Sequence, residues 1–454
     1  MHIRAFKFLG QKQLVALALN LPCAWLLDGW GAKSEGSPWL TLAVGVKKEA
    51  AILADLAEEL GTREKVSAES ELDEQPPFTS GFICILAYEA ASQIESSLNI
   101  PKVFGGVEQC SYLCCDASLS THQPSGKTYI YAKNKAAGDK LEALLKDALE
   151  NDNTSKYKSP QKFFVESDVT QAQFLAQVQS IQNRILAGDF FQANLTRMLS
   201  VDLGDTSRFQ LGGFAERFLS QSQAPFGAIL NLEKATVISA SPERFFRIEP
   251  SNQGRKIFAE PIKGTRPRHG DPELDEALKH DLLESEKDRA ENIMIADLVR
   301  NDLSRACTDE SIVADPICEL RSYKNVHHLV TRVSGVLRDE VSNLDALLAQ
   351  FPCGSITGAP KWAAMDAIAE LEQRGRGTYC GAIGFFDDRG HADFSVAIRT
   401  AVASFGESLN DDEQTGSTTL TYGTGGGITI LSDPEEEFFE TEDKAAGFLK
   451  ALQL

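Results

Sequence analysis

The 454-residue sequence contains no long apolar run. No stretch approaches the roughly 20 residues that a helix needs to cross a bilayer, and the first residues lack the features of a secretory signal. Positive charge is also scarce, since 45 Lys and Arg stand against 65 Asp and Glu, which gives a net charge of −20. A field of that sign repels nucleic-acid phosphates and anionic lipids. We therefore expect a soluble cytoplasmic protein whose partners include neither nucleic acid nor a membrane.

Several familiar motifs are missing as well. The nine cysteines show neither metal-ligand nor disulfide-framework spacing, which favours reduced, buried thiols. The glycine-rich stretch "TYGTGGGITI" (421–430) lacks the spacing and the following helix of a Walker loop or a dinucleotide fingerprint. Neither a G-x-S-x-G elbow nor a G-x-C-x-G segment is present. The sequence thus shows no nucleophilic triad and no glutaminase cysteine.

The chain is long enough for two domains or for one large domain built of two halves. We place the main boundary in the polar stretch 151–162, between an amino-terminal region (1–150) and a larger region (165–454). Helical patterns cover residues 46–60, 133–150, 168–189, 271–306 and 432–452, and strand patterns cover residues 127–132, 226–248 and, broken by glycines, 416–430. Because strands and helices do not alternate regularly, we expect an α+β fold with mostly antiparallel sheet.

Two predicted helices present carboxylates at i, i+3 spacing, which places each pair on one helical face. Asp288 and Glu291 form one pair, and Glu437 and Glu440 form the other. Like charges so placed repel each other unless a cation lies nearby, and a hard divalent ion such as magnesium takes carboxylate oxygens. In a chain with 65 acidic residues, however, either pair alone is more simply explained as a solvated acidic face.

Other polar residues are candidates for contact with a ligand, and each also has an ordinary structural explanation. Lys263, in "FAEPIKGTRPRHG" (258–270), is followed by a turn-forming Gly264, so its amine is either solvated or held still for chemistry. Glu243 follows a proline and is either a salt-bridged turn residue or a general acid. The remaining candidates are His327 and His328, Tyr379, Arg399 after an apolar strand, and the backbone of Gly425, Gly426 and Gly427.

Nine sequence segments that contain or flank these residues carry more information in their order and residue content than any single residue does. The segments are "GDFFQANLTR" (188–197), "SASPERFF" (239–246), "PIKGTRPR" (261–268), "KDRAENIMIADLVRNDL" (287–303), "VHHLV" (326–330), "GSITGAPK" (354–361), "RGTYCGAIGFF" (376–386), "IRT" (398–400) and "GTGGGI…EEEFFET" (423–441). Together they resemble the chorismate-utilising enzymes over roughly residues 165–450. That family includes the first components of anthranilate synthase and aminodeoxychorismate synthase, isochorismate synthase and salicylate synthase.

The resemblance implies a fold and a set of roles. The fold is that of anthranilate synthase component I, α+β, with two packed antiparallel sheets, helices outside and a central cleft, and residues 1–150 resemble its variable amino-terminal part. By resemblance, Glu291 and Glu440 coordinate Mg²⁺, with Asp288 and Glu437 acting mainly through water. Lys263 is the implied nucleophile, Glu243 the acid and His328 an orienting neighbour. The implied contacts to chorismate come from Tyr379, Arg399, Thr265 and Gly425, Gly426 and Gly427.

Within the family, Lys263 in "PIKGT" resembles aminodeoxychorismate synthase component I, because anthranilate synthases usually carry a small residue there. "WLLDG" (25–29) also departs from the "LLES" pattern that helps anthranilate synthases hold tryptophan. This branch converts chorismate and ammonia to 4-amino-4-deoxychorismate, the precursor of 4-aminobenzoate and folate. A separate glutaminase subunit, component II, is then the implied source of ammonia. The alternatives are anthranilate synthase component I, another chorismate enzyme, or a binding protein that kept the cleft without turnover.

Overall fold

The computed structural model describes residues 1–21, 24–29, 39–49, 52–63, 75–101, 107–150, 163–204, 211–222, 224–322, 326–406 and 417–452. The expected boundary at 151–162 lies outside these residues. Every pairing between the named strands is antiparallel. Together with the helices, this confirms the expected α+β class.

One continuous ladder of strands turns back on itself at β5 (Cys110–His122), whose edges pair with β3 on one side and with β4 and β6 on the other. The first layer runs through β7 (Val165–Ser167), β8 (Gln192–Asp202), β22 (Thr418–Ile428), β21 (Thr400–Phe405), β10 (Ala235–Ser241), β9 (Phe226–Asn231), β2 (Ala24–Asp28) and β3 (Trp39–Lys48). The second layer runs through β4 (Gly81–Leu86), β19 (Ala382–Asp387), β20 (Ala392–Val396), β11 (Arg244–Ser251), β12 (Gly254–Ala259), β17 (Val333–Val336) and β14 (Val313–Ala314). β6 (Lys127–Ala132) and β1 (His2–Phe6) extend the ladder beside β5, and β18 (Gly358–Ala359) pairs with β8.

Successive side chains along each strand point to opposite faces of the sheet, so each layer can bury one apolar face against the other. Leu230 of β9 and Ile85 of β4 belong to the apolar cluster between the layers. Their neighbours Ile229 and Leu86 point the other way, into clusters beneath the helices. Each fully buried side chain of this kind contributes about 1.5–3 kcal/mol relative to exposure. Since β2 pairs with β9 and β4 pairs with β19, the amino-terminal strands are integral to both layers.

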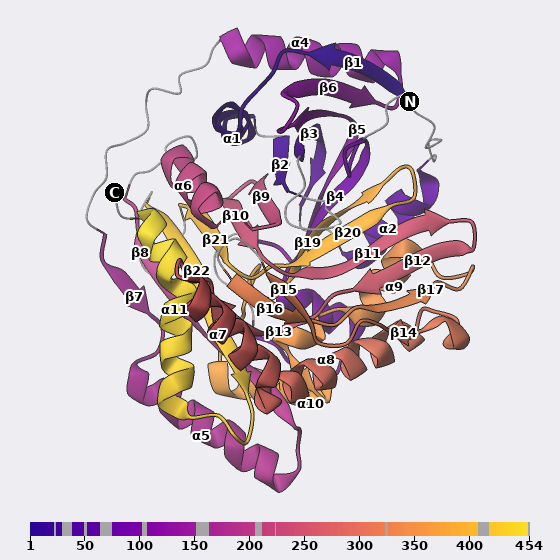
Figure 1. Cartoon of the computed structure of the whole chain (residues 1–454). Coiled ribbons are helices and arrows are strands. Elements are labelled where there is room, and N and C mark those ends of the chain that lie inside the picture. The colour runs from indigo at the N-terminus through magenta and orange to yellow at the C-terminus, as the bar shows by residue number, and fades with distance from the viewer. Residues whose placement is uncertain are drawn as a thin grey trace.

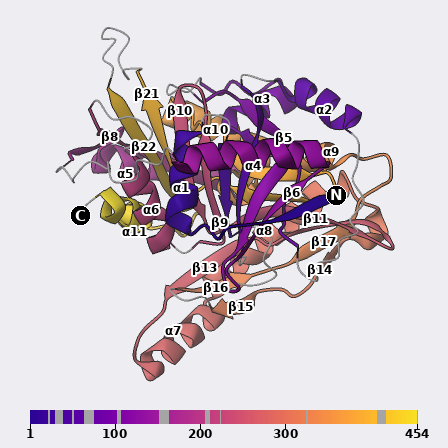
Figure 2. The same cartoon turned by 90° about the horizontal axis from the view of Figure 1, so that it is seen from above.

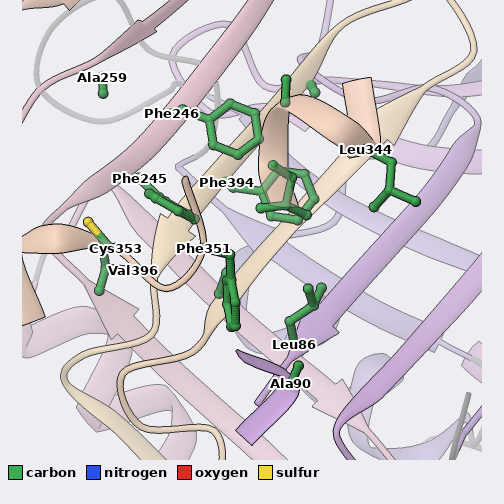
Figure 3. Close-up of a cluster of buried hydrophobic side chains, with 14 of the residues drawn as sticks. Leu86, Ala90, Phe245, Phe246, Ala259, Leu344, Phe351, Cys353, Phe394 and Val396 are labelled. Carbon is green, nitrogen blue, oxygen red and sulfur yellow. The ribbon is translucent and has the colours of Figure 1, made fainter. Parts of the chain in front are cut away.

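Helices cover the outer faces of the layers (Figure 1). They are α1 (Gln11–Asn20), α2 (Leu53–Thr62), α3 (Ala91–Ile94), α4 (Lys135–Glu150), α5 (Gln171–Ala187), α6 (Gly212–Ser222), α7 (Pro272–Glu284), α8 (Glu286–Ser304), α9 (Asn343–Gln350), α10 (Lys361–Glu372) and α11 (Pro434–Leu452), with 3-10 turns η1 (Tyr88–Ala90), η4 (Asp309–Ser311) and η5 (Gly354–Ile356). None of the helices within the described ranges is both long and apolar enough to cross a membrane. An aromatic cluster on the second layer, with Phe246 stacked on Phe394, supports the strand that follows Glu243 (Figure 3).

A separate small sheet carries four of the candidate residues, Lys263, Thr265, His327 and His328. β13 (Ile262–Pro267) pairs with β16 (Val326–Val330), which pairs in turn with β15 (Glu319–Ser322). Figure 2 shows this sheet and α7 projecting from the body of the molecule. Lys263 lies on β13 and His328 on β16, so both come from this projecting unit.

Most of the predicted helices form where the sequence signals place them. α5 is capped by Thr170, whose hydroxyl accepts from Gln173 N, and it ends at Gly188 in the left-handed conformation. The helical stretch 271–306 is two helices, because the Ser285 hydroxyl caps α8 by accepting from Asp288 N. The prediction of one helix over residues 46–60 is wrong at its start, because β3 continues to Lys48 in its pairing with β5.

Candidate active site

Lys263 lies on a strand with a bulge, not in a turn. It pairs with Leu329 of β16, and the register shifts between Lys263 and Thr265. The intervening Gly264 has a φ of +81°, and a Cβ there would lie 2.9 Å from Leu282 Cδ1 and 3.0 Å from Asp288 Cβ. Only glycine fits such a position without strain. The bulge at Gly264 therefore fixes the path of the strand next to the half-buried Lys263 side chain.

The Lys263 amine lies beside carboxylates and a glycine-rich strand. A Cβ added at Gly427 of β22 would lie 3.5 Å from Lys263 Nζ. Burial raises the pKa of Glu243 and of Glu291, and the nearby charge of Lys263 opposes this rise in both. Within the described ranges, no hydrogen bond or ion pair engages the amine itself. The amine is thus placed among acids and left available to a ligand.

Glu243, between β10 and β11, is 6% exposed. Its Oε1 atom is buried and has no hydrogen-bond partner among the residues that the structure describes. Burial raises the pKa of this carboxyl, and contacts with the Ser355 hydroxyl and with the charge of Lys263 offset only part of the rise. A buried carboxyl with a raised pKa and one unengaged oxygen is suited to give a proton to a ligand.

α8 and α11 bring their carboxylates close together. Burial raises the pKa of Glu291 on α8, and the charge of Glu440 on α11 adds to the rise. Burial and Glu440 likewise raise the pKa of Glu437, whose Oε1 accepts from the Ser432 hydroxyl at 2.7 Å. Burial also acts on Glu440, but its ion pair with Lys444 at 2.7 Å prevails and lowers the pKa. Two helices far apart in sequence therefore share one acidic region.

This acidic region offers the oxygen donors that a hard divalent cation prefers. Mg²⁺ commonly takes one or two protein carboxylates and leaves its other positions to water and substrate. Glu291 and Glu440 can supply two such carboxylates from different helices. Asp288 is instead paired with Arg266 at 3.2 Å, and no three His, Cys, Asp or Glu side chains of the described chain converge as a complete ligand group. The donors fit an ion held by two glutamates rather than by a closed protein cage.

The adjacent histidines of β16 have different surroundings. His328 Nδ1 lies 2.9 Å from Thr265 Oγ1. Burial and the nearby charge of Arg399 lower the pKa of His328 to about 4, so its ring is neutral at physiological pH. His327 is fully buried and its Nε2 lies 3.0 Å from Asp275 Oδ1. His327 thus supports the fold, whereas His328 faces the candidate site.

A cavity of about 300 Å³ is lined by His328, Arg399 and Lys444, together with residues of α6 and α11. Arg399 has a φ of +48°, and its carbonyl accepts from Ala240 N at 2.9 Å. Such a conformation costs a non-glycine residue about 1–3 kcal/mol and persists only where the surrounding structure imposes it. Within the described ranges no carboxylate pairs with the Arg399 guanidinium, so this cation remains available to an anionic ligand.

Three successive glycines of β22 allow close approach of neighbouring groups. A Cβ at Gly425 would lie 2.3 Å from Leu195 O, one at Gly426 would lie 3.1 Å from Glu437 Oε2, and one at Gly427 would lie 2.0 Å from Gln192 Nε2. The expectation of a strand broken by glycines is wrong, because β22 runs through all of them in register with β8. The strand is continuous and its glycines make room for the site.

Tyr379 packs against the same strand. A Cβ at Gly423 would lie 2.3 Å from the Tyr379 ring, which is 7% exposed. Burial raises the pKa of the Tyr379 hydroxyl well above its usual value, so the hydroxyl stays protonated. Tyr379 thus lies against Gly423 of β22, the strand that also carries Gly425, Gly426 and Gly427.

Three residues that the sequence reasoning did not single out also belong here. Lys444 donates to Gly425 O at 2.8 Å and pairs with Glu440. Gln192, 1% exposed, has an Oε1 atom without a hydrogen-bond partner among the described residues. Ser355 contacts Glu243. The i, i+4 spacing of Glu440 and Lys444 was a visible signal, and the other two lie within motifs that were recognised as segments.

The comparisons with known proteins agree with this geometry. The family model described as chorismate binding enzyme matches residues 32–450. The chain is 44% identical over 280 residues to an aminodeoxychorismate synthase of Streptomyces griseus, covering 62% of this chain and 36% of that protein. It is 36% identical over 307 residues to aminodeoxychorismate synthase component 1 of Escherichia coli, covering 66% of this chain and 63% of that protein. It thus spans less than two thirds of the length of these relatives.

A solved structure extends the likeness over nearly the whole chain. Anthranilate synthase component I of Streptococcus pneumoniae superposes with a TM-score of 0.71 at 25% identity, covering 98% of this chain and 91% of that one. The sequence match, the packed antiparallel layers and the convergence of the recognised segments on one region all agree. This chain belongs to the chorismate binding enzymes.

Proposed function

We propose that this protein is the chorismate-aminating component of an aminodeoxychorismate synthase, which forms 4-amino-4-deoxychorismate for 4-aminobenzoate and folate synthesis. The observation that carries the proposal is the Lys263 amine, held near Gly427 and among the carboxylates of Glu243 and Glu291. The names of the relatives from Streptomyces griseus and Escherichia coli support it.

The chemistry needs a nucleophile and an acid that act together. Lys263 Nζ attacks the ring carbon two positions from the carbon that bears the hydroxyl, the double bonds shift, and the C–O bond breaks. Glu243 gives its proton to the departing oxygen, which leaves as water. The reaction requires a neutral amine and a protonated acid.

Ammonia completes the exchange. Its nitrogen bonds to the carbon that lost the hydroxyl, the double bonds shift back, and the C–N bond to Lys263 breaks. The amino group then occupies the original position of the hydroxyl. Two successive displacements of this kind permit overall retention of configuration.

The remaining groups suit the carboxylates of chorismate. Arg399 and Lys444 lie on one cavity wall, where they can pair with the enolpyruvyl carboxylate. The neutral His328, hydrogen-bonded to Thr265, presents a polar ring to the cavity without adding charge. We further propose that the backbone of Gly425, Gly426 and Gly427 faces the ligand, with Tyr379 packed against Gly423 of the same strand.

Mg²⁺ is the cofactor that we propose, with Glu291 and Glu440 as its protein ligands and Glu437 and Asp288 acting mainly through water. When bound, the ion supplies a positive charge to the ring carboxylate and so draws electron density from the diene. The raised pKa values of Glu291 and Glu437 support the proposal, because burial and, to a lesser degree, the charge of Glu440 disfavour their ionised forms, which a bound cation would favour.

Incubation of the purified chain with chorismate, Mg²⁺ and ammonium tests the function directly. We expect 4-amino-4-deoxychorismate by chromatography and mass spectrometry, and 4-aminobenzoate only after a lyase is added. Fluorescent anthranilate formed without lyase would instead identify the chain as an anthranilate synthase component I.

The proposed reaction also needs a source of ammonia. Since the sequence contains no G-x-C-x-G elbow, we propose a separate glutaminase subunit as the partner. The name of the Escherichia coli relative, aminodeoxychorismate synthase component 1, supports a two-component enzyme.

A further inference from the structure

Five large apolar side chains lie exposed around the ends of α5 and β22 and the start of α11, which we call the α5–α11 rim. They are Leu186 (72% exposed), Phe191 (71%), Ile430 (44%), Leu431 (75%) and Phe439 (56%). Gln182 of α5 donates to the carbonyls of Ile430 and Ser432, at 3.5 and 2.7 Å, which holds α5 against the turn between β22 and α11. Figure 1 shows α5 and the start of α11 side by side, and Leu186 lies one helical turn beyond Gln182. A cluster of this kind marks an interaction surface.

The rim borders the wall that faces Lys263. Phe191 immediately precedes Gln192, whose buried amide reaches the Cβ position of Gly427, 3.5 Å from Lys263 Nζ. In the ladder of β22 with β8, Ile428 pairs with Ala193 and Gly427 pairs with Asn194. Ile430 and Leu431 lie in the turn just beyond the end of this pairing. A protein seated on the rim would therefore lie within one residue of the wall of the reaction site.

The charge around the rim indicates what kind of protein fits. Asp433, Glu435 and Glu436 begin α11 beside Leu431 and are exposed. A second copy of this chain, itself carrying −20, would bring an identical acidic edge against this one. A partner with basic side chains around an apolar centre complements it instead.

The chemistry of ammonia favours delivery at this place. In bulk water at neutral pH ammonia is mostly ammonium, which has no lone pair for attack. A subunit that releases ammonia next to Gln192 would pass the neutral molecule directly toward the half-buried Lys263.

We propose that the α5–α11 rim is the docking surface of the ammonia-supplying glutaminase subunit, and that the facing surface of that subunit carries apolar side chains framed by Lys and Arg. This inference rests on the proposed amination reaction and adds to it the place where the partner binds. The rim residues themselves take no part in catalysis.

The test uses the double variant Leu186→Glu/Leu431→Glu of the full chain, mixed with the glutaminase subunit of the same organism. With glutamine as nitrogen donor, we expect at least a tenfold loss of product formation and loss of the complex in analytical ultracentrifugation. With ammonium, the rate stays within twofold of the unchanged chain, which also shows that the variant is folded. Val46→Glu is the matched control, since Val46 is 76% exposed on β3, and it leaves both rates and the complex intact.

A second variant tests the charge argument without touching the apolar side chains. Glu435→Lys/Glu436→Lys reverses the acidic edge, and we expect it to weaken the complex at low salt more than at high salt. A complex and a glutamine-dependent rate that survive both double variants would overturn the proposal. So would a dimer of this chain alone that Leu186→Glu/Leu431→Glu dissociates. If the unchanged chain does not aminate chorismate, the proposed function is wrong. Ultracentrifugation of the chain with the glutaminase subunit still tests the docking surface independently of that activity.

Discussion

Lys263 and Gly427 lie on strands of two different sheets, yet a single methyl group added to Gly427 would lie 3.5 Å from the Lys263 amine. The bulge at Gly264 fixes the course of one strand, and close packing against Gln192 restricts the other to glycine. The amine is therefore positioned by backbone geometry from two directions. Glu243 and Glu291 complete its surroundings, and the proposed chemistry depends on this arrangement.

Replacing Glu243 by glutamine tests the acid. We expect kcat to fall about 10²–10⁴-fold, the range of general acid–base catalysis, while chorismate still binds. Because burial raises the pKa of Glu243 and the protonated form is the active one, the rate carried by this group falls as pH rises through that pKa.

Ser355→Ala refines the same test. The Ser355 contact lowers the pKa of Glu243 against the larger effect of burial, so its removal shifts the alkaline limb of the kcat profile to higher pH. A rate profile that Glu243→Gln leaves unchanged in height and shape would show that another group supplies the proton.

Magnesium is expected to stabilise the protein, and more so at higher pH. Burial raises the native pKa of Glu291 and Glu437 above the unfolded value of 4.5, so their contribution to stability is complete below that value and is lost as pH rises through the native pKa values. A bound cation restores stability by mass action, about 2.7 kcal/mol at a concentration 100 times the Kd.

Thermal unfolding at pH 6 and 8, with and without Mg²⁺, measures this effect. The rise in Tm should be larger at pH 8 and should disappear in Glu291→Gln and in Glu440→Gln. Glu435→Gln, an exposed residue of the same α11, is the control. An equal rise in all variants would indicate binding elsewhere.

His328 is expected to act as a neutral group. Its pKa of about 4 lies below the ordinary 6.5 because of burial and of Arg399. As pH falls from 6.5 to 4, the unfolded chain takes up the proton first, so His328 lowers stability over that window. The loss of kcat/KM in His328→Asn should therefore be the same at pH 6.5 and 8, as measured by steady-state kinetics. A loss that grows toward pH 6.5 would contradict a neutral ring.

The requirement for glycine on β22 can be tested by measuring the stability of a variant. Gly423→Ala would place a methyl group 2.3 Å from the buried Tyr379 ring, and overpacking of this kind costs about 1–3 kcal/mol. Urea unfolding should show that loss. Gly61→Ala, where nothing lies within 4 Å of the added methyl group, should show none. A Gly423→Ala variant as stable as the unchanged chain would instead mean that the Tyr379 ring yields easily.

Local signals predict the helices of the site well, because caps and spacing act within a few residues. Thr170 and Gly188 bound α5, and the i, i+3 carboxylates of α11 lie on one helix as predicted. The helical spacing of residues 46–60 gives a wrong prediction at its start. The first three of these residues belong to β3 and pair with β5, and tertiary pairing overrides helical spacing. Gly264 was expected in a turn and lies in a bulge, because the strand continues beyond it in the pairing with β16.

The convergence of the site could be expected only through the family resemblance. Nothing in local sequence brings Lys263 of β13 to Gly427 of β22, since 163 residues separate them (427 − 263 − 1) and the contact exists only in the folded chain. For the same reason no local signal marks Gln192 or Ser355 as a site residue. Their significance lies in an unpartnered buried oxygen and in a contact with Glu243, neither of which is local.

The central claim is that the Lys263 amine carries out the first displacement on chorismate. The most direct measurement is the rate of ammonium-supported 4-amino-4-deoxychorismate formation by Lys263→Ala, with circular dichroism as the check on folding. We predict at least a hundredfold loss, partly restored by added ethylamine, which can enter the space that the side chain vacates. A folded Lys263→Ala variant that forms 4-amino-4-deoxychorismate within tenfold of the unchanged rate would contradict the account.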